Sequence, residues 1–417
     1  MEKKPFLTEA MAQEIIQDVP TPFHVYDEKG IRENARRINK AFSWNKGFKE
    51  YFAVKALPNP VILQILQEEG CGVDCSSLTE LMLSEVCGFT GSDIMFSSNQ
   101  TPVEDMQKAY ELGAYINLDD ATMVDFLDRV AGVPETVFCR YNPGGTFSLG
   151  KSEEGFQVMD KPGDAKYGMT EEQMIDSYKK LMAKGAKHFG IHAFLASNTI
   201  SDAYYPELAA ILFQLAVRIK RELDLAVDSI LILGGLGVSY RASDNAPDLT
   251  AVSERVRRSY ETLLTPAGVT PKLILAEGRL MAAKAGVLGS RVLAVKRQQT
   301  PLVILDADCA QLLREIAFGA SHRIVAPLAP ESRGKQLVRV AGAISDLRDH
   351  FSGSFVLPEL KLGECVAILD TGADGRSFGS NYGGSLGCAE FLIEHGAVRC
   401  IRKRQTMDEL MASFDVE

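Results

Sequence analysis

Lys55 follows the apolar run YFAV at residues 51–54, and its amine is the group in this chain with the most evident chemical use. An apolar run of this kind is typical of a buried strand. At the mouth of such a strand, partial burial lowers the pKa of a lysine and makes its amine a nucleophile that can form a Schiff base. A surface lysine with its alkyl stem packed on apolar neighbours is the alternative.

Polar residues also follow the other short apolar runs of this region. In chain order they are Asp74, Ser97, Asn99, Asp119, Arg140, His192, Ser197, the glycines of GGLG at 234–237, and Arg279. Any one of them, taken alone, is more often a solvent-exposed residue that ends a strand than a functional residue. Glycines after a strand let backbone N–H groups approach an anion closely, and an arginine after the next strand could bind the same anion. A Schiff-base lysine together with a phosphate-binding loop indicates pyridoxal phosphate as the cofactor.

The elements that must position these residues follow a regular order. Eight short apolar runs between residues 50 and 280 alternate with segments of helical periodicity. Parallel strands need crossover helices, so this alternation predicts an α/β fold, a (β/α)8 TIM-like barrel with its working face at the C-terminal strand ends. An open doubly wound sheet would give a similar pattern, and the strand count favours the barrel.

Beyond about residue 285 the pattern changes to short strand candidates separated by turns, which predict a mainly antiparallel β domain. We therefore expect two domains, a cofactor-binding barrel at 23–283 and a β domain made of 1–22 and 284–417. The insert at 145–169 follows the fifth predicted barrel strand. It is either a surface elaboration or a flap over the barrel mouth.

Composition excludes several other classes of protein. The 417 residues carry a formal net charge of −10 without a continuous basic stripe, so we expect no nucleic-acid partner. We expect no membrane span and no signal peptide, because no apolar run is long enough, and hence a cytoplasmic protein. The eight cysteines lack paired CxxC spacing and a nearby histidine pair, so we expect reduced thiols and no metal site.

Six motifs stand in the same order as in the fold-type III pyridoxal-phosphate-dependent amino-acid decarboxylases: YFAVKALPNP, GVDCSSLTEL, RYNPGG, GIHAFLASN, GGLGVSY and EGR. The chain resembles these enzymes over essentially its whole length, most closely the diaminopimelate decarboxylases. The resemblance implies the alanine-racemase-like combination of barrel and β domain. It also implies a head-to-tail homodimer, in which the loop at Ser345–Asp346 reaches into the partner's site.

The resemblance further implies roles for single residues. Lys55 would hold the cofactor as a Schiff base, and the catalytic set is Lys55, His192, Ser345 and Asp346. Substrate would be bound by Arg279, Arg314 and Asp346. The cofactor-binding set is Lys55, Asp74, Arg140, Phe194, Ser197, Gly235, Gly237, Glu277, Gly278, Arg279, Asp374 and Tyr382.

Phe194 stands where the family has a histidine that stacks on the cofactor ring, a mild change because a phenyl ring can also stack, and three further positions depart from the family's pattern. Ala276 stands where the family has an acid that pairs with the pyridine nitrogen, and strand alternation would point the neighbouring Glu277 to the other face. Ser345 replaces a cysteine that protonates the product, although a hydroxyl is a far weaker acid than a thiol. Asp374 replaces a tyrosine that contacts the phosphate, and a carboxylate there would repel it.

The function implied by the resemblance is decarboxylation of an amino acid with pyridoxal phosphate. The substrate would be meso-diaminopimelate, giving lysine, or a related amino acid of a specialised pathway. The alternative is a catalytically impaired paralogue that acts by binding, as antizyme inhibitors do beside ornithine decarboxylase. A racemase carries less weight, because no tyrosine stands at GADG to serve as a second base.

Overall fold

The computed structural model describes residues 6–99, 101–145, 164–232, 234–241, 245–318, 320–327, 329–330 and 332–415. The chain forms two compact units. One consists of Met1–Ile31, Ser239–Asp244 and Ala282–Glu417, and the other of Arg32–Val238 and Asn245–Met281. None of the helices in the described ranges is long and apolar enough to cross a membrane. Each unit is described below by itself.

The second unit is a closed barrel of eight parallel strands, as predicted, and β9 pairs with β2 to close it. Closure excludes the open doubly wound sheet. Each predicted apolar run contains one strand. The strands are β2 (Lys49–Ala53), β3 (Gly72–Cys75), β4 (Ile94–Ser98), β5 (Tyr115–Leu118), β6 (Thr136–Arg140), β7 (His188–Ala193), β8 (Ser229–Ile232) and β9 (Lys272–Glu277).

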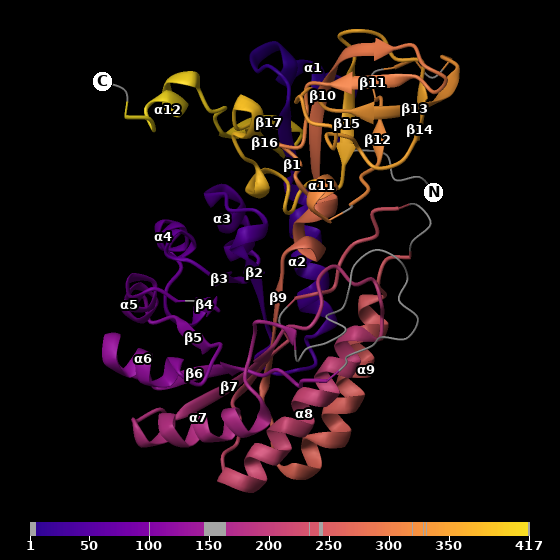
Figure 1. Cartoon of the computed structure of the whole chain (residues 1–417). Helices are drawn as coiled ribbons and strands as arrows, with labels where there is room; N and C mark the ends of the chain where they lie inside the picture. The colour runs from indigo at the N-terminus through magenta and orange to yellow at the C-terminus, as the bar shows by residue number, and fades with distance from the viewer. Residues whose placement is uncertain are drawn as a thin grey trace. The chain divides into compact units, whose positions relative to one another are not determined.

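Helices follow the strands and lie around the barrel (Figure 1). Local capping explains where several begin. Asn59 caps α3 with Pro60 in its first turn, Ser77 caps α4, and Thr170 forms a capping box with Gln173 on α7. The helices are α2 (Glu28–Ala41), α3 (Pro60–Glu68), α4 (Leu78–Val86), α5 (Val103–Glu111), α6 (Met123–Val130), α7 (Glu171–Ala183), α8 (Tyr204–Leu223), α9 (Leu249–Leu263) and α10 (Arg279–Ala282).

The barrel interior is filled with side chains. A buried cluster joins inward-facing residues of five strands: Tyr51, Met95, Phe138, Leu231, Ile274 and Ala276. Filling a small barrel in this way is expected, since eight strands leave an interior of side-chain width. Strand alternation from these residues then fixes which polar residues face the interior nearer the C-terminal strand ends.

The first unit is the predicted β domain. Its nine-stranded sheet is mainly antiparallel, with parallel pairing of β1 to β16 and of β11 to β13. The strands are β1 (Phe23–Asp27), β10 (Gly286–Lys296), β11 (Leu302–Leu305), β12 (Ile324–Val325), β13 (Lys335–Ala341), β14 (Phe355–Pro358), β15 (Cys365–Leu369), β16 (Ala389–Glu394) and β17 (Ala397–Arg402). It also carries α1 (Glu9–Asp18), α11 (Arg314–Phe318) and α12 (Met407–Met411).

The domain boundary drawn from the sequence differs at one strand. We placed residues 23–27 in the barrel domain, but β1 lies in the sheet of the β domain, between β10 and β16. A strand that precedes the first crossover helix can pair with either sheet, so the sequence pattern does not decide between them. Residues 146–163 of the predicted insert lie outside the described residues, and the prediction of a flap stays untested.

Candidate functional site

Lys55 lies just past the end of β2. The strand ends at Ala53, and a 3-10 turn (Val54–Ala56) carries Lys55 beyond it. Val54 and Ala56 are buried whereas Lys55 is exposed, so the predicted partial burial of this lysine is not seen. A β-carbon on Gly278 would lie 2.8 Å from the Ala56 β-carbon, so the end of β9 packs closely against this turn. The amine is accessible at the barrel mouth.

Asp74 is the acidic group next to this lysine. It is the register partner of Ala53 on the adjacent strand and is buried. Burial raises the pKa of Asp74 to about 7, and the charges of Lys55 and Arg140 oppose this increase. Asp74 is therefore poised to change its charge near neutral pH beside the amine.

Arg140 brings a buried positive charge into the barrel. Its guanidinium forms an ion pair with Asp119 at 3.0 Å, and both side chains are almost fully buried. Asp119 also accepts the backbone N–H of Gly168 at 3.2 Å. The guanidinium carbon lies 4.1 Å from the centroid of the Tyr167 ring and 5.8 Å from that of Phe194. Arg140 is thus positioned by charge and by aromatic contacts together.

His192 faces the same interior and is held by Asn117. The amide nitrogen of Asn117 lies 2.8 Å from Nδ1 of the imidazole, so as placed it donates to Nδ1 and leaves the proton on Nε2. Burial, together with the charge of Arg140, keeps the pKa of His192 well below its usual value. The imidazole is therefore neutral, and it can donate from Nε2.

The glycine loop after β8 requires glycine for steric reasons. Gly235 has φ of +104°, and a β-carbon there would lie 2.6 Å from the ring of Tyr204. Its carbonyl accepts the N–H of Thr199 at 2.8 Å, and Gly237 donates its own N–H to the Thr199 carbonyl at 2.8 Å. The N–H of Gly237 is thus already bonded within the chain, and a β-carbon there would lie 2.2 Å from the Asn198 side chain, so Gly237 contributes to this site through the shape of the loop.

Ser197 and Arg279 meet at the same end of the barrel. The guanidinium of Arg279 donates a hydrogen bond to the hydroxyl of Ser197, although the two residues are 82 positions apart in sequence. Both were predicted to bind phosphate. Their contact places a hydroxyl and a cation together beside the glycine loop, which is the donor set that a phosphate ester needs.

Glu277 does not face the barrel interior. It is almost fully buried, accepts a hydrogen bond from Tyr205 on α8, and donates its backbone N–H to Glu50 at 2.9 Å. Burial and the charge of Glu50 raise the pKa of Glu277 well above its usual value. The interior side of β9 presents the methyl group of Ala276. Glu277 therefore does not belong to the cofactor-binding set that the sequence predicts, because strand alternation directs its side chain to the surrounding helices.

The β domain holds the other predicted site residues. Arg314 is buried and pairs with Asp374 at 2.8 Å. Asp346 accepts a hydrogen bond from the hydroxyl of Tyr382 at 2.7 Å, whereas Ser345 is exposed. The backbone N–H of Arg348 and the Tyr382 hydroxyl hold the pKa of Asp346 below its usual value. Asp346 is therefore ionised at neutral pH and is a poor proton donor.

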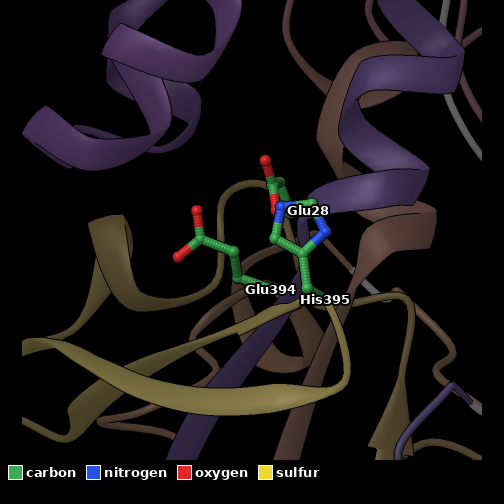
Figure 2. Close-up of side chains that lie close together, drawn as sticks. All are labelled: Glu28, Glu394 and His395. Atoms are coloured by element: carbon green, nitrogen blue, oxygen red, sulfur yellow. The ribbon is translucent and has the colours of Figure 1, made fainter.

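A separate group of possible metal ligands lies in the β domain. Figure 2 shows Glu28, at the start of α2, beside Glu394, the last residue of β16, and His395, which follows it. The possible ligand atoms of the three residues lie within 4.8 Å of one another. Glu394 also pairs with Arg399 at 3.2 Å. Because this arginine already balances one carboxylate, we assign no metal to the cluster.

The barrel residues fit a phosphorylated aldehyde cofactor. Within the described residues, four buried atoms of the interior have no hydrogen-bond partner, namely Asp74 Oδ1, Ser97 Oγ, Asn117 Oδ1 and His192 Nε2. Buried polar atoms normally have partners, so these four indicate a polar ligand above the core. Lys55 supplies the amine, Ser197 and Arg279 supply the phosphate contacts, and Phe194 offers a ring face. Pyridoxal phosphate, when bound, supplies an electron sink.

A closed parallel barrel with these residues at its mouth defines a class of enzymes that bind pyridoxal phosphate, and comparison with known proteins agrees. Residues 28–283 match the family model "Pyridoxal-dependent decarboxylase, pyridoxal binding domain". Protein TabA of Pseudomonas amygdali pv. tabaci is 36% identical over 400 residues, covering 96% of this chain and 92% of that protein. The chain therefore belongs to the pyridoxal-dependent decarboxylase family, whose members are carboxy-lyases.

Two further relatives carry a more specific name. The diaminopimelate decarboxylase of Methanothermobacter thermautotrophicus is 28% identical over 409 residues, covering 98% of this chain and 94% of that protein. A solved structure of a diaminopimelate decarboxylase is 26% identical with a TM-score of 0.86, covering 99% of this chain and 98% of that chain. The predicted family and cofactor are confirmed, and the likeness extends over both units.

Sequence reasoning did not single out Asn117, Tyr167 or Tyr205. Asn117 stands one residue before the end of an apolar run, so strand alternation could have placed it inside the barrel. Tyr167 and Tyr205 carry no comparable signal, because each acts on a residue far from it in the sequence.

Proposed function

We propose that this decarboxylase removes CO₂ from meso-diaminopimelate to give lysine, or from a related amino acid of a specialised pathway. The names of the diaminopimelate decarboxylases that resemble it over nearly their whole length support the first substrate. The higher identity to protein TabA, which carries no substrate in its name, supports keeping the second. The observation that best supports this activity is that Lys55, Asp74 and the Ser197–Arg279 pair lie at the same end of the barrel.

Each barrel residue has a definite task in this proposal. Lys55 holds the aldehyde carbon of the cofactor, and Ser197 and Arg279 bind its phosphate. The neutral imidazole of His192, which Asn117 orients, offers its Nε2–H to the cofactor from the barrel interior. Pyridoxal phosphate held by these residues would supply the electron sink that decarboxylation needs.

The roles of the β-domain residues are proposed from the resemblance alone. Arg314 would bind a substrate carboxylate, and the loop at Ser345–Asp346 would reach into the active site of the partner in a homodimer. We also propose, from the resemblance alone, that the enzyme is a cytoplasmic homodimer and that Gly235, Gly237, Gly278, Asp374 and Tyr382 contribute to cofactor binding.

One observation favours a second candidate, a catalytically impaired paralogue that acts by binding. The methyl group of Ala276 faces the interior, and Glu277 is engaged by Tyr205 on the other side of β9. No acid of β9 therefore reaches the interior to pair with the pyridine nitrogen. The orphaned interior atoms and the accessible lysine weigh against this candidate, because they suit a bound cofactor.

Reconstitution of the purified protein with pyridoxal phosphate tests the proposal. We expect an absorbance band of lysine-bound cofactor, borohydride fixation of the cofactor on Lys55 shown by peptide mass spectrometry, and loss of both in Lys55→Ala. We then expect CO₂ release from a panel of meso-diaminopimelate, lysine, ornithine and arginine, fastest with the first. A protein that takes up no cofactor would overturn the proposal. Cofactor uptake without CO₂ release from any amino acid would favour the impaired paralogue.

A further inference from the structure

We propose that Tyr167 is a positioning residue of the cofactor site, which holds the guanidinium of Arg140 in place by stacking on it. This inference rests on the proposed function, because it assigns Arg140 to the site that binds the cofactor. Tyr167 comes from the end of the insert rather than from a barrel strand.

The contact between the two side chains is close. The guanidinium carbon of Arg140 lies 4.1 Å from the ring centroid of Tyr167, within the range of a cation–π contact. Arg140 is 5% exposed, so little water competes for its face. A desolvated contact of this kind is stronger than one at the surface.

Hydrogen bonds to the backbone hold Tyr167 where it can make this contact. The side-chain amide of Asn142 donates to the carbonyl of Tyr167 at 2.6 Å, and Met169 donates its backbone N–H to the carbonyl of Arg140 at 2.8 Å. Gly168, with φ of +83°, lies between them and donates its N–H to Asp119. A β-carbon there would lie 2.9 Å from the Asn142 β-carbon, so this turn needs glycine. Residues 167–169 are thus bound to the end of β6 and to the partner of Arg140.

The position of Arg140 matters because its charge acts on two other groups of the site. It lowers the pKa of Asp74, opposing burial, and it also lowers the pKa of His192. A guanidinium released from Tyr167 could turn toward water at the mouth. Asp74 would then bind a proton at higher pH, beside the lysine that holds the cofactor.

Three variants distinguish the effect of losing the aromatic contact with Arg140 from the effect of changing a side chain in general. Tyr167→Leu removes the aromatic face, Tyr167→Phe retains it, and Tyr110→Leu changes a tyrosine of α5 that is 41% exposed and lies outside the site. For each apoprotein, the Kd for pyridoxal phosphate is measured by titration. The midpoint of the pH dependence of the bound cofactor's absorbance and the thermal midpoint of the apoprotein are measured in parallel.

We expect Tyr167→Leu to raise the Kd about three- to tenfold, the loss expected for one partly desolvated cation–π contact. We also expect its absorbance midpoint to shift by about half a pH unit or more. Tyr167→Phe and Tyr110→Leu should stay within about twofold of the wild type in Kd, and their midpoints should not move. A purely structural role would lower the thermal midpoint alone.

The outcomes are distinct. If Tyr167→Leu binds the cofactor as tightly as the wild type and titrates at the same pH, the inference is wrong while the proposed function stands. If the wild type itself binds no cofactor, the proposed function fails and the inference with it. Should Tyr167→Leu not fold, Tyr167→Gln provides the same comparison with a side chain of similar reach and no ring.

Discussion

Arg314 and Asp374 form a buried ion pair, with 2.8 Å between Nη1 and Oδ2. Arg314 is almost fully buried and 12% of the Asp374 side chain is exposed. The acid that the sequence placed near a phosphate is therefore balanced by a cation of the same unit. The same contact uses part of the guanidinium that was expected to bind a substrate carboxylate.

The pair predicts an effect of Asp374→Asn on substrate preference. Removing this carboxylate leaves more of the Arg314 guanidinium for an anionic substrate. We expect KM for an amino acid with a second carboxylate to fall by about tenfold or more, because a charge-assisted hydrogen bond is worth about 1.5–3 kcal/mol. Asp370→Asn is the control, since Asp370 pairs with Lys284 instead, at 2.8 Å. Equal KM values in Asp374→Asn and the wild type would show that Asp374 does not compete with substrate.

The exposed Ser345 predicts a gain of activity. Asp346 beside it is ionised at neutral pH, because its pKa is lowered, so neither residue of this loop is a good acid. A thiol has an ordinary pKa of about 8.5 and donates a proton far more readily than a hydroxyl. We expect Ser345→Cys to raise kcat by about tenfold or more, measured as CO₂ release. Ser354→Cys, at another exposed serine of the β domain, should have no effect. An unchanged kcat in Ser345→Cys would remove this loop from proton donation.

The buried hydrogen bond from Tyr205 to Glu277 predicts a loss of stability. Tyr205→Phe withdraws a donor from a buried carboxyl group, which costs about 1–3 kcal/mol in the free energy of unfolding. Urea denaturation of the apoprotein measures it. Tyr178→Phe is the matched comparison, because the buried Tyr178 hydroxyl donates to the Gly190 carbonyl at 2.8 Å. The raised pKa of Glu277 favours its neutral form, so both losses should fall in the same range, and a loss in Tyr205→Phe well below that of Tyr178→Phe would contradict the prediction.

Asp74 predicts a pH dependence of stability. Its pKa is about 7 in the folded chain, against about 3.9 in the unfolded chain, so folding stabilises its protonated form. The stability it contributes is complete below about pH 4 and is lost as pH rises through about 7. We expect apo Asp74→Asn to gain about 3 kcal/mol relative to the wild type between pH 4.5 and 8, measured by urea denaturation. Asp176→Asn, at an exposed acid, is the control for charge removal. A stability difference that is the same at both pH values would refute the raised pKa.

Much of the fold and part of the site could be predicted from the sequence, since both depend on local pattern. The alternation of short apolar runs with helical segments predicts the barrel, because each strand needs a crossover helix of its own. Strand alternation also predicts that Glu277 and Ala276 face opposite sides of β9. Residues at strand ends, such as Lys55 and Asp74, converge because parallel strands share one edge.

Only the tertiary structure decided which side chains meet. Arg314 and Asp374 are 60 positions apart, and Tyr205 and Glu277 are 72 apart. The helical or strand periodicity of the sequence therefore predicts neither contact. The same holds for Tyr167, which reaches Arg140 from another segment of the chain. β1 joined the sheet of the β domain because pairing, rather than propensity, selects a strand's neighbours. The sequence by itself thus determined the elements and the chemistry available at their ends. The charge balance at each end depends on distances between remote residues, and these exist only in the folded chain.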